Sequence, residues 1–370
     1  RIQDKSENNV NKFLVSTIKH NLLEFQLSVP DNNKNLIFSN NRLVESKVSD
    51  GDIRGAVGLR ILSSNFGLAP PSLSSYEAMK DKHPPPSPTR PLSFPSPPTS
   101  PATNLTVSAD LVLQAIATFP NGSSGGIDGL RPQHLKDLLS SSSGDAGRKL
   151  LLAITNLCNF MLSGKVNAKI CNILYGASLI ALEKKDGGLR PIAVGNVFRR
   201  LVSKLACTYF RDQMTTYLFP TQLGFGVRSG CEKIIHAVRS FLTSPNIGNQ
   251  ILCKIDFQNA FNCLNRDVML KVVQEKIPML YAFLWQVYRH PSNLYFNTDI
   301  ILSHNGVQQG DPLGPLLFSL TLHPIISKLK SNLHLFYLDD GILLDDPQCV
   351  LSDLQSLVVS CKSNGLESRY

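Results

Sequence analysis

Two adjacent aspartates, Asp339 and Asp340, lie between two apolar runs in the stretch LFYLDDGILL (335–344). Apolar runs on both sides of a short polar break predict a β-hairpin whose tip carries both carboxylates. Neighbouring carboxylates repel one another at neutral pH, and a bound divalent cation would remove that repulsion. A solvated surface turn is the alternative interpretation of this pair.

A third carboxylate, Asp256, comes near the end of the apolar run ILCKIDF (251–257), just before a polar break and a predicted helix. If this strand pairs beside the hairpin, three carboxylates from two neighbouring strands can hold two Mg²⁺ ions. Such ions, about 4 Å apart, activate a 3′-hydroxyl, clamp the attacked phosphate and stabilise the pyrophosphate leaving group. The arrangement is therefore suited to nucleotidyl transfer. A helix N-cap is a second role for Asp256, and it does not exclude the first.

Between these acids lies GVQQGDPLGPLLFSLTL (306–322), a Gly-Pro turn before a predicted helix. Gly310 and Gly314 allow a close backbone approach, and Pro312 suits the first turn of a helix. Gln309 then lies at the helix entrance, where it could contact a base or a sugar. Taken alone, the pattern is equally typical of a structural turn.

The remaining elements must position these residues. Residues 177–194 read as a hairpin with a basic tip, and helical patterns follow at about 197–209, 232–242 and 266–276. This mixture predicts an α+β fold. Nine prolines in residues 83–101 predict an extended, solvated linker between an N-terminal region of unknown role (1–82) and the rest of the chain.

Composition narrows the class of protein. The 370 residues are 42% apolar, enough for a sizeable core, and no run reaches the ~18 apolar residues of a membrane span. The N-terminus does not resemble a signal peptide, so we expect an intracellular protein of the nucleus or cytoplasm, neither secreted nor in a membrane. The eight cysteines show no zinc-ligand spacing and read as reduced core residues.

Positive charge is unevenly distributed along the chain. The net charge is +9, and residues 184–239 hold ten Lys or Arg against three Asp or Glu. Residues 240–370 hold nine against eleven. This distribution suggests that one stretch meets an anionic partner while the next gathers carboxylates, although two ordinary solvated surfaces would look the same.

The order of the motifs resembles that of the reverse transcriptases, most closely the non-LTR, LINE-type retrotransposon enzymes. DFQNAFN (256–262), QQGDPLGPLLF (308–318) and FYLDD (336–340) are similar to the family's motifs A, B and C. Three further stretches resemble finger-region motifs: SSGGIDGLRPQHLK (123–136), LEKKDGGLRPIAV (182–194) and TQLGFGVRSGCEKIIHAVR (221–239). The resemblance covers roughly residues 105–366.

The resemblance implies a right-hand polymerase, with fingers mainly in 102–250 and a palm mainly in 251–370. The palm would be an antiparallel sheet packed on helices. The sequence stops at Tyr370, where the family's next motif begins, which implies a fragment truncated before the thumb. Two positions depart from the family pattern: Leu338 stands where Ala is usual, and Asn262 where Asp is frequent.

Individual roles follow from the same resemblance. Asp256 and Asp339 match catalytic metal ligands and Asp340 a less direct one, for two Mg²⁺ ions that Mn²⁺ may replace. Phe261 matches the steric gate that favours deoxynucleotides, although core packing would explain it alone. Gln309 and Gly310 correspond to residues that line the nucleotide site.

The resemblance also gives roles to basic residues. Arg190 matches the finger arginine that grips the triphosphate, a role that suits the planar guanidinium fork. Near the same hairpin tip, Lys184 and Lys185 are weaker candidates for nucleotide binding. We expect four residues of the basic stretch to follow the phosphates of template and primer: Arg199, Arg200, Lys204 and Arg228.

The implied function is an RNA-directed DNA polymerase that uses an RNA template, a DNA primer and deoxynucleoside triphosphates; its protein partners are unknown. An RNA-dependent RNA polymerase is a competitor, which Phe261 and the YLDD form, rather than GDD, disfavour. The alternative from another class is a truncated, catalytically weak or inactive retroelement relic that still binds nucleic acid. The three aspartates favour a competent site, and the missing thumb favours the relic.

Overall fold

The computed structural model describes residues 67–370 except 87–89, 91, 97, 99–103, 185, 244–247 and 370. The chain divides into two compact units, Arg1–Leu68 and Ala69–Tyr370. The description that follows concerns the second unit. Its first residue falls inside the region 1–82, ahead of the proline-rich segment.

The first of two sheets has the strand order β2-β1-β4-β5. β1 (Ala177–Glu183) and β2 (Leu189–Gly195) form the antiparallel hairpin expected at 177–194. The β4 (Ser292–Phe296) and β5 (Asp299–Ser303) hairpin was not foreseen from the sequence, and it joins β1 through a short parallel pairing. Its turn contains Asn297 at φ +54°, a conformation that Asn tolerates better than most residues.

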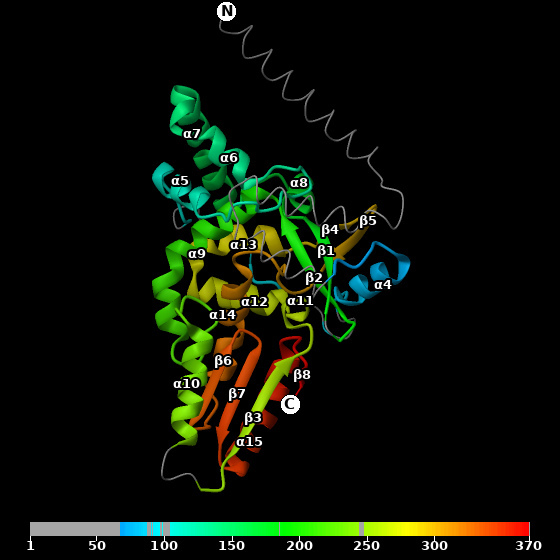
Figure 1. The fold of residues 1–370 in the computed structure, drawn as a ribbon, viewed down its shortest axis with the longest axis vertical. Coiled ribbons are helices and arrows are strands. Elements are labelled where there is room, and N and C mark those ends of the chain that lie inside the picture. Colours follow the sequence, from blue (N-terminus) through cyan, green and yellow to red (C-terminus); the bar gives the residue numbers. More distant parts are fainter. Residues whose placement is uncertain are drawn as a thin grey trace, which may run out of the picture. The chain divides into compact units, whose positions relative to one another are not determined.

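The second sheet is antiparallel throughout and has the order β6-β7-β3-β8. β3 (Ile251–Phe257) lies between β7 (Asp340–Asp345) and the short β8 (Ser368–Arg369), and β6 (Leu333–Tyr337) forms one edge (Figure 1). Ile255 pairs with Gly341, so the C-terminal end of β3 lies beside the β6–β7 turn. Pairing of the 251–257 strand with the hairpin is thereby confirmed.

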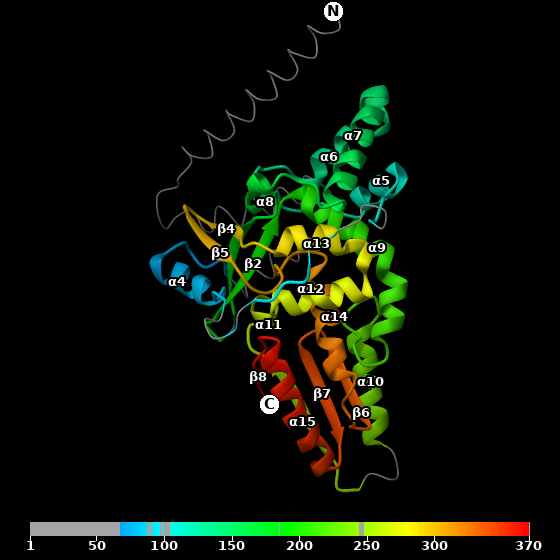
Figure 2. The same cartoon turned by 180° about the vertical axis from the view of Figure 1, so that it is seen from behind.

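Helices pack on one face of this second sheet. α15 (Pro347–Ser363) lies against β3 and β7, and α14 (Gly314–Ile326) packs on α15 (Figure 2). α14 is apolar all round because other elements surround it: Leu316, Leu317 and Leu320 are fully buried. The α+β class and an antiparallel sheet packed on helices are both confirmed.

Further helices complete the unit. α9 (Val197–Leu218) packs against α5 (Ala109–Ala117), α7 (Gly144–Leu162) and α14, while α10 (Gly230–Leu242) lies along β6. The others are α4 (Leu73–Asp81), α6 (Pro132–Leu138), η2 (Ser141–Ser143), α8 (Ala168–Leu174), α11 (Ala260–Cys263), α12 (Arg266–Lys276), η3 (Pro278–Leu280) and α13 (Tyr281–Tyr288). Among the described helices none is both long and apolar enough to span a membrane.

The proline-rich segment has no helix or strand in its described residues; Pro85, Ser93, Ser96 and Pro98 are exposed, but hydrogen bonds anchor the segment at several points. Arg90 donates two hydrogen bonds of 3.1 and 3.0 Å to the carboxylate of Asp267, which is 1% exposed. The Tyr281 hydroxyl donates to the Ser96 carbonyl at 2.6 Å. Composition identified the lack of regular structure, whereas the docking depends on partners about 180 residues away in sequence.

Candidate active site

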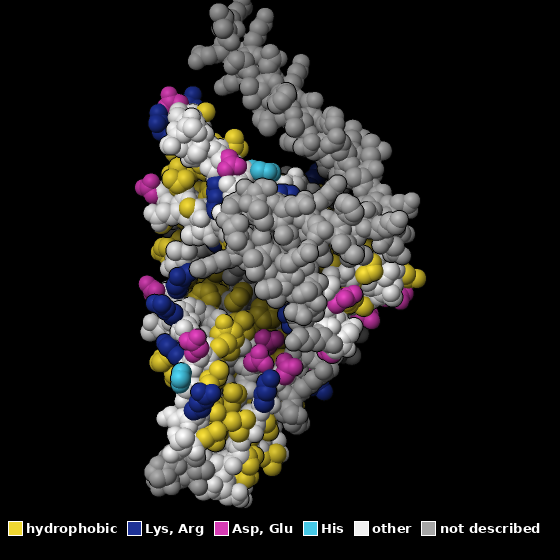
Figure 3. All heavy atoms as spheres, viewed as in Figure 1, with side chains coloured by type: hydrophobic (Ala, Val, Ile, Leu, Met, Phe, Trp, Pro, Cys, Tyr) yellow, Lys and Arg dark blue, Asp and Glu magenta, His cyan; other side chains and the backbone are white. Residues whose placement is uncertain are grey.

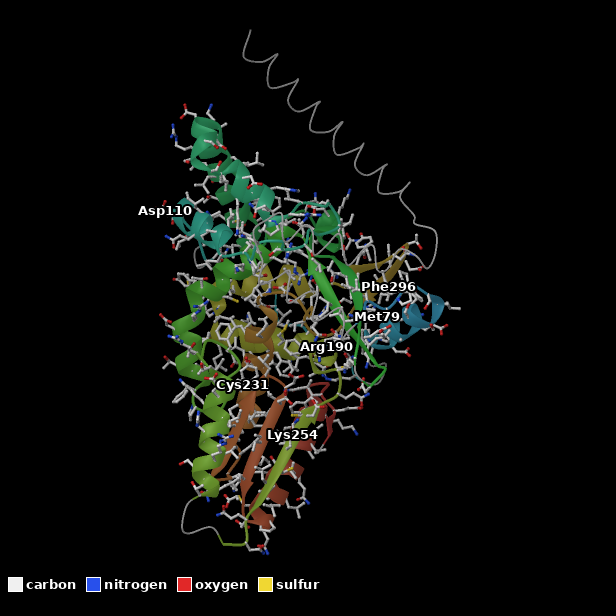
Figure 4. The ribbon with its side chains drawn as sticks, in the orientation of Figure 1. Met79, Asp110, Arg190, Cys231, Lys254 and Phe296 are labelled. Carbon is white, nitrogen blue, oxygen red and sulfur yellow. The ribbon has the colours of Figure 1, made fainter. Side chains whose placement is uncertain are left out.

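A cavity of about 530 Å³ lies where the β1–β2 hairpin meets the ends of β3 and β6. Asp256, Asp339, Asp340, Arg190 and Gln309 all line it, with Lys184 and Phe261. Arg190 comes from β2 (Figure 4), and the acidic side chains visible in Figure 3 gather beside an apolar surface. The remaining lining residues are Lys82, Leu189, Pro191, Phe257, Gln258, Asn259, Ala260 and Leu338.

The three aspartates come from adjacent strands, as the register requires. Asp256 lies one position beyond the Ile255–Gly341 pair, Asp340 begins β7, and Asp339 lies in the turn between β6 and β7. Burial raises the pKa of Asp339, the negative charges of Asp340 and Asp256 raise it further, and Arg190 opposes the rise. Asp340 and Asp256 therefore lie close enough to destabilise the charged form of Asp339.

A divalent cation suits this donor set, because it would relieve the repulsion between oxygen ligands that Mg²⁺ prefers. The carboxylate oxygens of the three aspartates do not all lie within 4.8 Å of one another; in the part of the chain that the structure describes, Asp345, Asp346 and Cys349 form such a group. That group is structural: Asp345 accepts hydrogen bonds from the Asn332 backbone and side chain, and Asp346 caps α15.

The turn that carries Asp339 has an unusual backbone. Leu338 has φ +58°, a conformation that costs an L-residue roughly 1–2 kcal/mol. The fully buried side chain of Gln222 holds it: Gln222 Oε1 accepts from Leu338 N at 2.8 Å, and Nε2 donates to Leu338 O at 3.0 Å. Gly224 packs so closely that a Cβ there would lie 2.5 Å from Leu338 N.

The segment containing Gln222 is itself attached to the sheet. Phe336 N donates to Thr221 O at 2.7 Å, and Leu223 N donates to Phe336 O at 2.8 Å. Residues 221–223 thus run along the edge strand β6. Gln222 is fixed by backbone hydrogen bonds on both sides, which orients its amide toward the turn.

The position of Phe261 is compatible with both roles considered for it, a wall of the nucleotide site and core packing. Its ring lines the cavity and also stacks on Phe318 of α14, with ring centroids 4.8 Å apart and planes inclined by 12°. Its carbonyl accepts a 2.7 Å hydrogen bond from Val307 N. The cavity wall at this position is therefore rigid.

Gln309 and Gly310 connect the entrance of α14 to β2. Ala193 N donates to Gln309 O at 2.7 Å. Gly310 has φ +131°, and a Cβ there would lie 2.4 Å from Ala193 O, so this position requires glycine. Gln309 lines the cavity as expected; Gly310 does not, and instead permits the close approach of the two segments.

The family model for reverse transcriptase (RNA-dependent DNA polymerase) matches residues 182–369. This chain belongs to the reverse transcriptase family. The match runs from the basic hairpin through the strand-end aspartate to the last described strand. It therefore includes every residue that lines the cavity except Lys82.

Several individual proteins are similar to this reverse transcriptase. The SLACS 132 kDa retrotransposable element protein of Trypanosoma brucei gambiense is 27% identical over 270 residues, 69% of this chain and 22% of that protein. A putative COX1/OXI3 intron 1 protein of Saccharomyces cerevisiae is 21% identical over 43% of this chain and 19% of its own length. This chain thus spans about a fifth of these relatives.

Among solved structures, a Candida tropicalis telomerase in complex with a telomeric RNA fragment is similar to 53% of this reverse transcriptase. The match covers 40% of the telomerase chain, at 13% identity and a TM-score of 0.40.

The basic residues of the reverse transcriptase divide into two kinds, and the expectation for Arg199 is corrected. Arg199 is 1% exposed; its Nε donates to Asp311 Oδ2 at 2.8 Å and its Nη2 to the Tyr288 hydroxyl at 3.3 Å. This arginine joins α9 to the loop before α14 and cannot reach a phosphate. The sequence around Arg199 gave no sign of the buried partner, because Asp311 lies 112 residues later in the chain.

Arg200 and Lys204 are also held internally. Arg200 donates to Ser124 O at 2.5 Å, Lys204 Nζ donates to Thr118 O at 3.3 Å, and both lie over the Phe119 ring. Arg228 is exposed and remains a candidate for backbone contact. Lys184 lines the cavity, whereas Lys185 lies outside the described residues.

Gln222, Asn259 and Lys82 were not foreseen as site residues. Gln222 stands in the stretch TQLGFG, whose resemblance to a family motif was the available signal. Asn259 adopts φ +52° and anchors a distant carbonyl, a typical use of Asn after a strand. Nothing in the sequence around Lys82 signalled a site.

We expect Gln222→Ala to destabilise this reverse transcriptase by about 1–3 kcal/mol, because both backbone groups of Leu338 lose their partner. Leu338→Gly removes the Cβ penalty at positive φ, so the loss caused by Gln222→Ala should be smaller in that background. Urea unfolding of the two single variants and the double variant measures this coupling. Equal losses in both backgrounds would contradict a role in holding the turn.

Arg199→Met should cost about 3–5 kcal/mol of unfolding free energy, because Asp311 would be left buried without its cation. The matched change Arg228→Met, at an exposed position, should stay within about 0.5 kcal/mol. Chemical denaturation monitored by circular dichroism compares the two. Similar losses for both variants would show that Arg199 is not part of the core.

Proposed function

We propose that this chain is the catalytic core of an RNA-directed DNA polymerase, which adds deoxynucleotides to the 3′-hydroxyl of a DNA primer on an RNA template. The observation that carries the proposal is that Asp256, Asp339 and Asp340 line one cavity with Arg190. Carboxylates suited to divalent cations beside a guanidinium suited to phosphate match a metal-bound nucleoside triphosphate.

The carboxylates of Asp256 and Asp339, with a looser contribution from Asp340, would hold two Mg²⁺ ions, for which Mn²⁺ can substitute. The raised pKa of Asp339 supports this assignment, because its cause is partly the neighbouring charges that a cation would neutralise. When bound, these ions activate the primer hydroxyl and neutralise charge on the attacked and leaving oxygens.

The rest of the cavity would select the nucleotide. Arg190 binds the triphosphate as a bidentate donor, with Lys184 as a second cation near the same hairpin tip. Phe261 lies under the sugar, where its ring would clash with a 2′-hydroxyl. Because Phe261 is backed by Phe318, the ring cannot easily withdraw from such a clash.

The template and primer would follow the exposed basic surface that includes Arg228, with an affinity that falls as salt rises. We further propose a non-LTR, LINE-type retrotransposon as the source of this enzyme, acting inside the cell in the nucleus or cytoplasm. Motif order and the similarity to a retrotransposable element protein support this. No protein partner is proposed.

The decisive experiment is primer extension on an RNA template with Mg²⁺ and deoxynucleotides. Asp339→Asn should lower the rate at least about a thousandfold, since several kcal/mol of charge stabilisation at the transition state is lost. Asp110→Asn makes the same chemical change at an exposed position on α5 and should leave the rate unchanged.

Extension by the wild-type chain that Asp339→Asn does not reduce would refute the assignment of the metal site. A wild-type chain that binds primer–template but never extends it would favour the alternative, a catalytically inactive retroelement relic.

Phe261→Val should lower the preference for deoxy- over ribonucleotides by at least about tenfold, because the ring that excludes the 2′-hydroxyl is removed. The measurement is the ratio of kcat/KM for the two nucleotides, which does not depend on the fraction of folded protein. Phe318→Leu weakens the packing but keeps the Phe261 ring, so its ratio should stay close to that of wild type. An unchanged ratio in Phe261→Val would remove Phe261 from sugar selection.

A further inference from the structure

The wall of the cavity includes one residue from outside the matched family region, Lys82. It directly follows α4, about 100 residues before the family match begins at residue 182. It lines the same space as the three aspartates and Arg190. The segment that contains α4 and Lys82 therefore contributes a cation to the candidate active site.

The backbone at Lys82 is attached to the loop that follows Asp256. Lys82 O accepts a 2.8 Å hydrogen bond from Asn259 Nδ2, and Asn259 lies three residues after Asp256. Asn259 is held in turn, because its Oδ1 accepts from Asn262 Nδ2 at 2.9 Å. Lys82 is thus fixed to the loop that carries one of the proposed metal ligands.

The next residue, His83, fixes the same position from the helix side. Its Nδ1 lies 2.8 Å from Met79 O, and the residue is 8% exposed. Burial lowers the pKa of His83. Since a carbonyl oxygen can only accept, Nδ1–H is the donor in this bond.

α4 itself is anchored in a small apolar cluster. Met79 is fully buried among Leu179 of β1, Ala193 of β2 and Phe296 of β4. Figure 4 shows Met79 and Phe296 as neighbours, with Arg190 farther along β2. The Ser72 hydroxyl caps the helix by accepting from Ser75 N at 3.1 Å. A buried anchor and a cap are typical of an ordered element, which can hold Lys82 in a constant place.

The positive charge of the Lys82 ammonium group is available to an anionic ligand. Lys82 is half-buried and makes no ion pair within the described part of the chain. Its charge opposes the rise that burial causes in the pKa of Cys263, so it lies near α11 and the loop after β3. The cavity then holds three carboxylates for cations and three described basic residues, Lys82, Lys184 and Arg190, for phosphates.

We propose that Lys82 binds a phosphate group of the incoming deoxynucleoside triphosphate, so that the N-terminal segment completes the nucleotide site. The inference rests on the proposed polymerase function. It gives the anchored segment around α4 a role in substrate binding as well as in stability.

The test is steady-state primer extension with Mg²⁺ by the full chain and its Lys82→Ala, Lys82→Arg and Lys80→Ala variants. Lys82→Ala should raise KM for the deoxynucleotide about tenfold, the effect of losing one charge-assisted hydrogen bond, with little change in kcat. Lys82→Arg should recover most of the affinity. Lys80→Ala removes the same charge from the last turn of α4, outside the cavity lining, and should behave as wild type.

Binding of a fluorescent deoxynucleoside triphosphate and of primer–template, each followed by anisotropy, supplies readouts independent of turnover. Weaker nucleotide binding in Lys82→Ala, with primer–template binding unchanged, supports the proposal. The reverse pattern would overturn the proposal and assign Lys82 to the nucleic-acid backbone. Equal effects of Lys80→Ala and Lys82→Ala would also overturn it, because they would indicate a general effect of charge. If the wild-type chain polymerises and Lys82→Ala has the same KM and nucleotide affinity, only the role of Lys82 is refuted. If the wild-type chain neither binds nucleotide nor polymerises, the proposed function is refuted as well.

Discussion

The placement of three carboxylates in one cavity is the constraint on which the arrangement of this chain depends. Asp256, Asp339 and Asp340 line one cavity, and burial together with the charges of Asp340 and Asp256 raises the pKa of Asp339. Side chains that repel stay together only where the backbone leaves them no alternative. The β3–β7 register supplies one part of that restraint and the clamped Leu338 turn supplies the other.

The basic residues fall into two groups, those paired inside the protein and those that line the cavity. Arg199 forms an ion pair with the buried Asp311 and thereby joins the long helix α9 to the entrance of α14. Arg190, Lys184 and Lys82 form no ion pair among the described residues and face the cavity. Net charge alone cannot distinguish these two groups, because a buried and a cavity-lining Lys or Arg contribute equally to it. Burial and the presence of an internal partner separate the cations that build the protein from those that can meet a ligand.

Much of this fold could be predicted from the sequence because its signals are local. Apolar runs bounded by polar breaks predicted the β1–β2 hairpin and β3, and motif order indicated that Asp256 and Asp339 belong to one site. The partners of Gln222 and Arg199 lie 116 and 112 residues away, respectively, so no local pattern reveals them. The β4–β5 hairpin is short and depends on an Asn turn, and the docking of the proline-rich segment depends on Asp267 and Tyr281.

The anchoring of the N-terminal segment has a consequence for how the molecule is made. The partners of Lys82 and Arg90 each lie 177 residues later in the chain, and that of the Pro84 carbonyl lies 221 residues later. On a ribosome this segment emerges before these partners, so it cannot dock until most of the described unit has been synthesised. Contacts of such high sequence separation slow folding, because a long loop has to close before they form. The buried residues that cover Met79 in the folded protein also come at least 98 residues later, so during synthesis its side chain would lack those apolar partners.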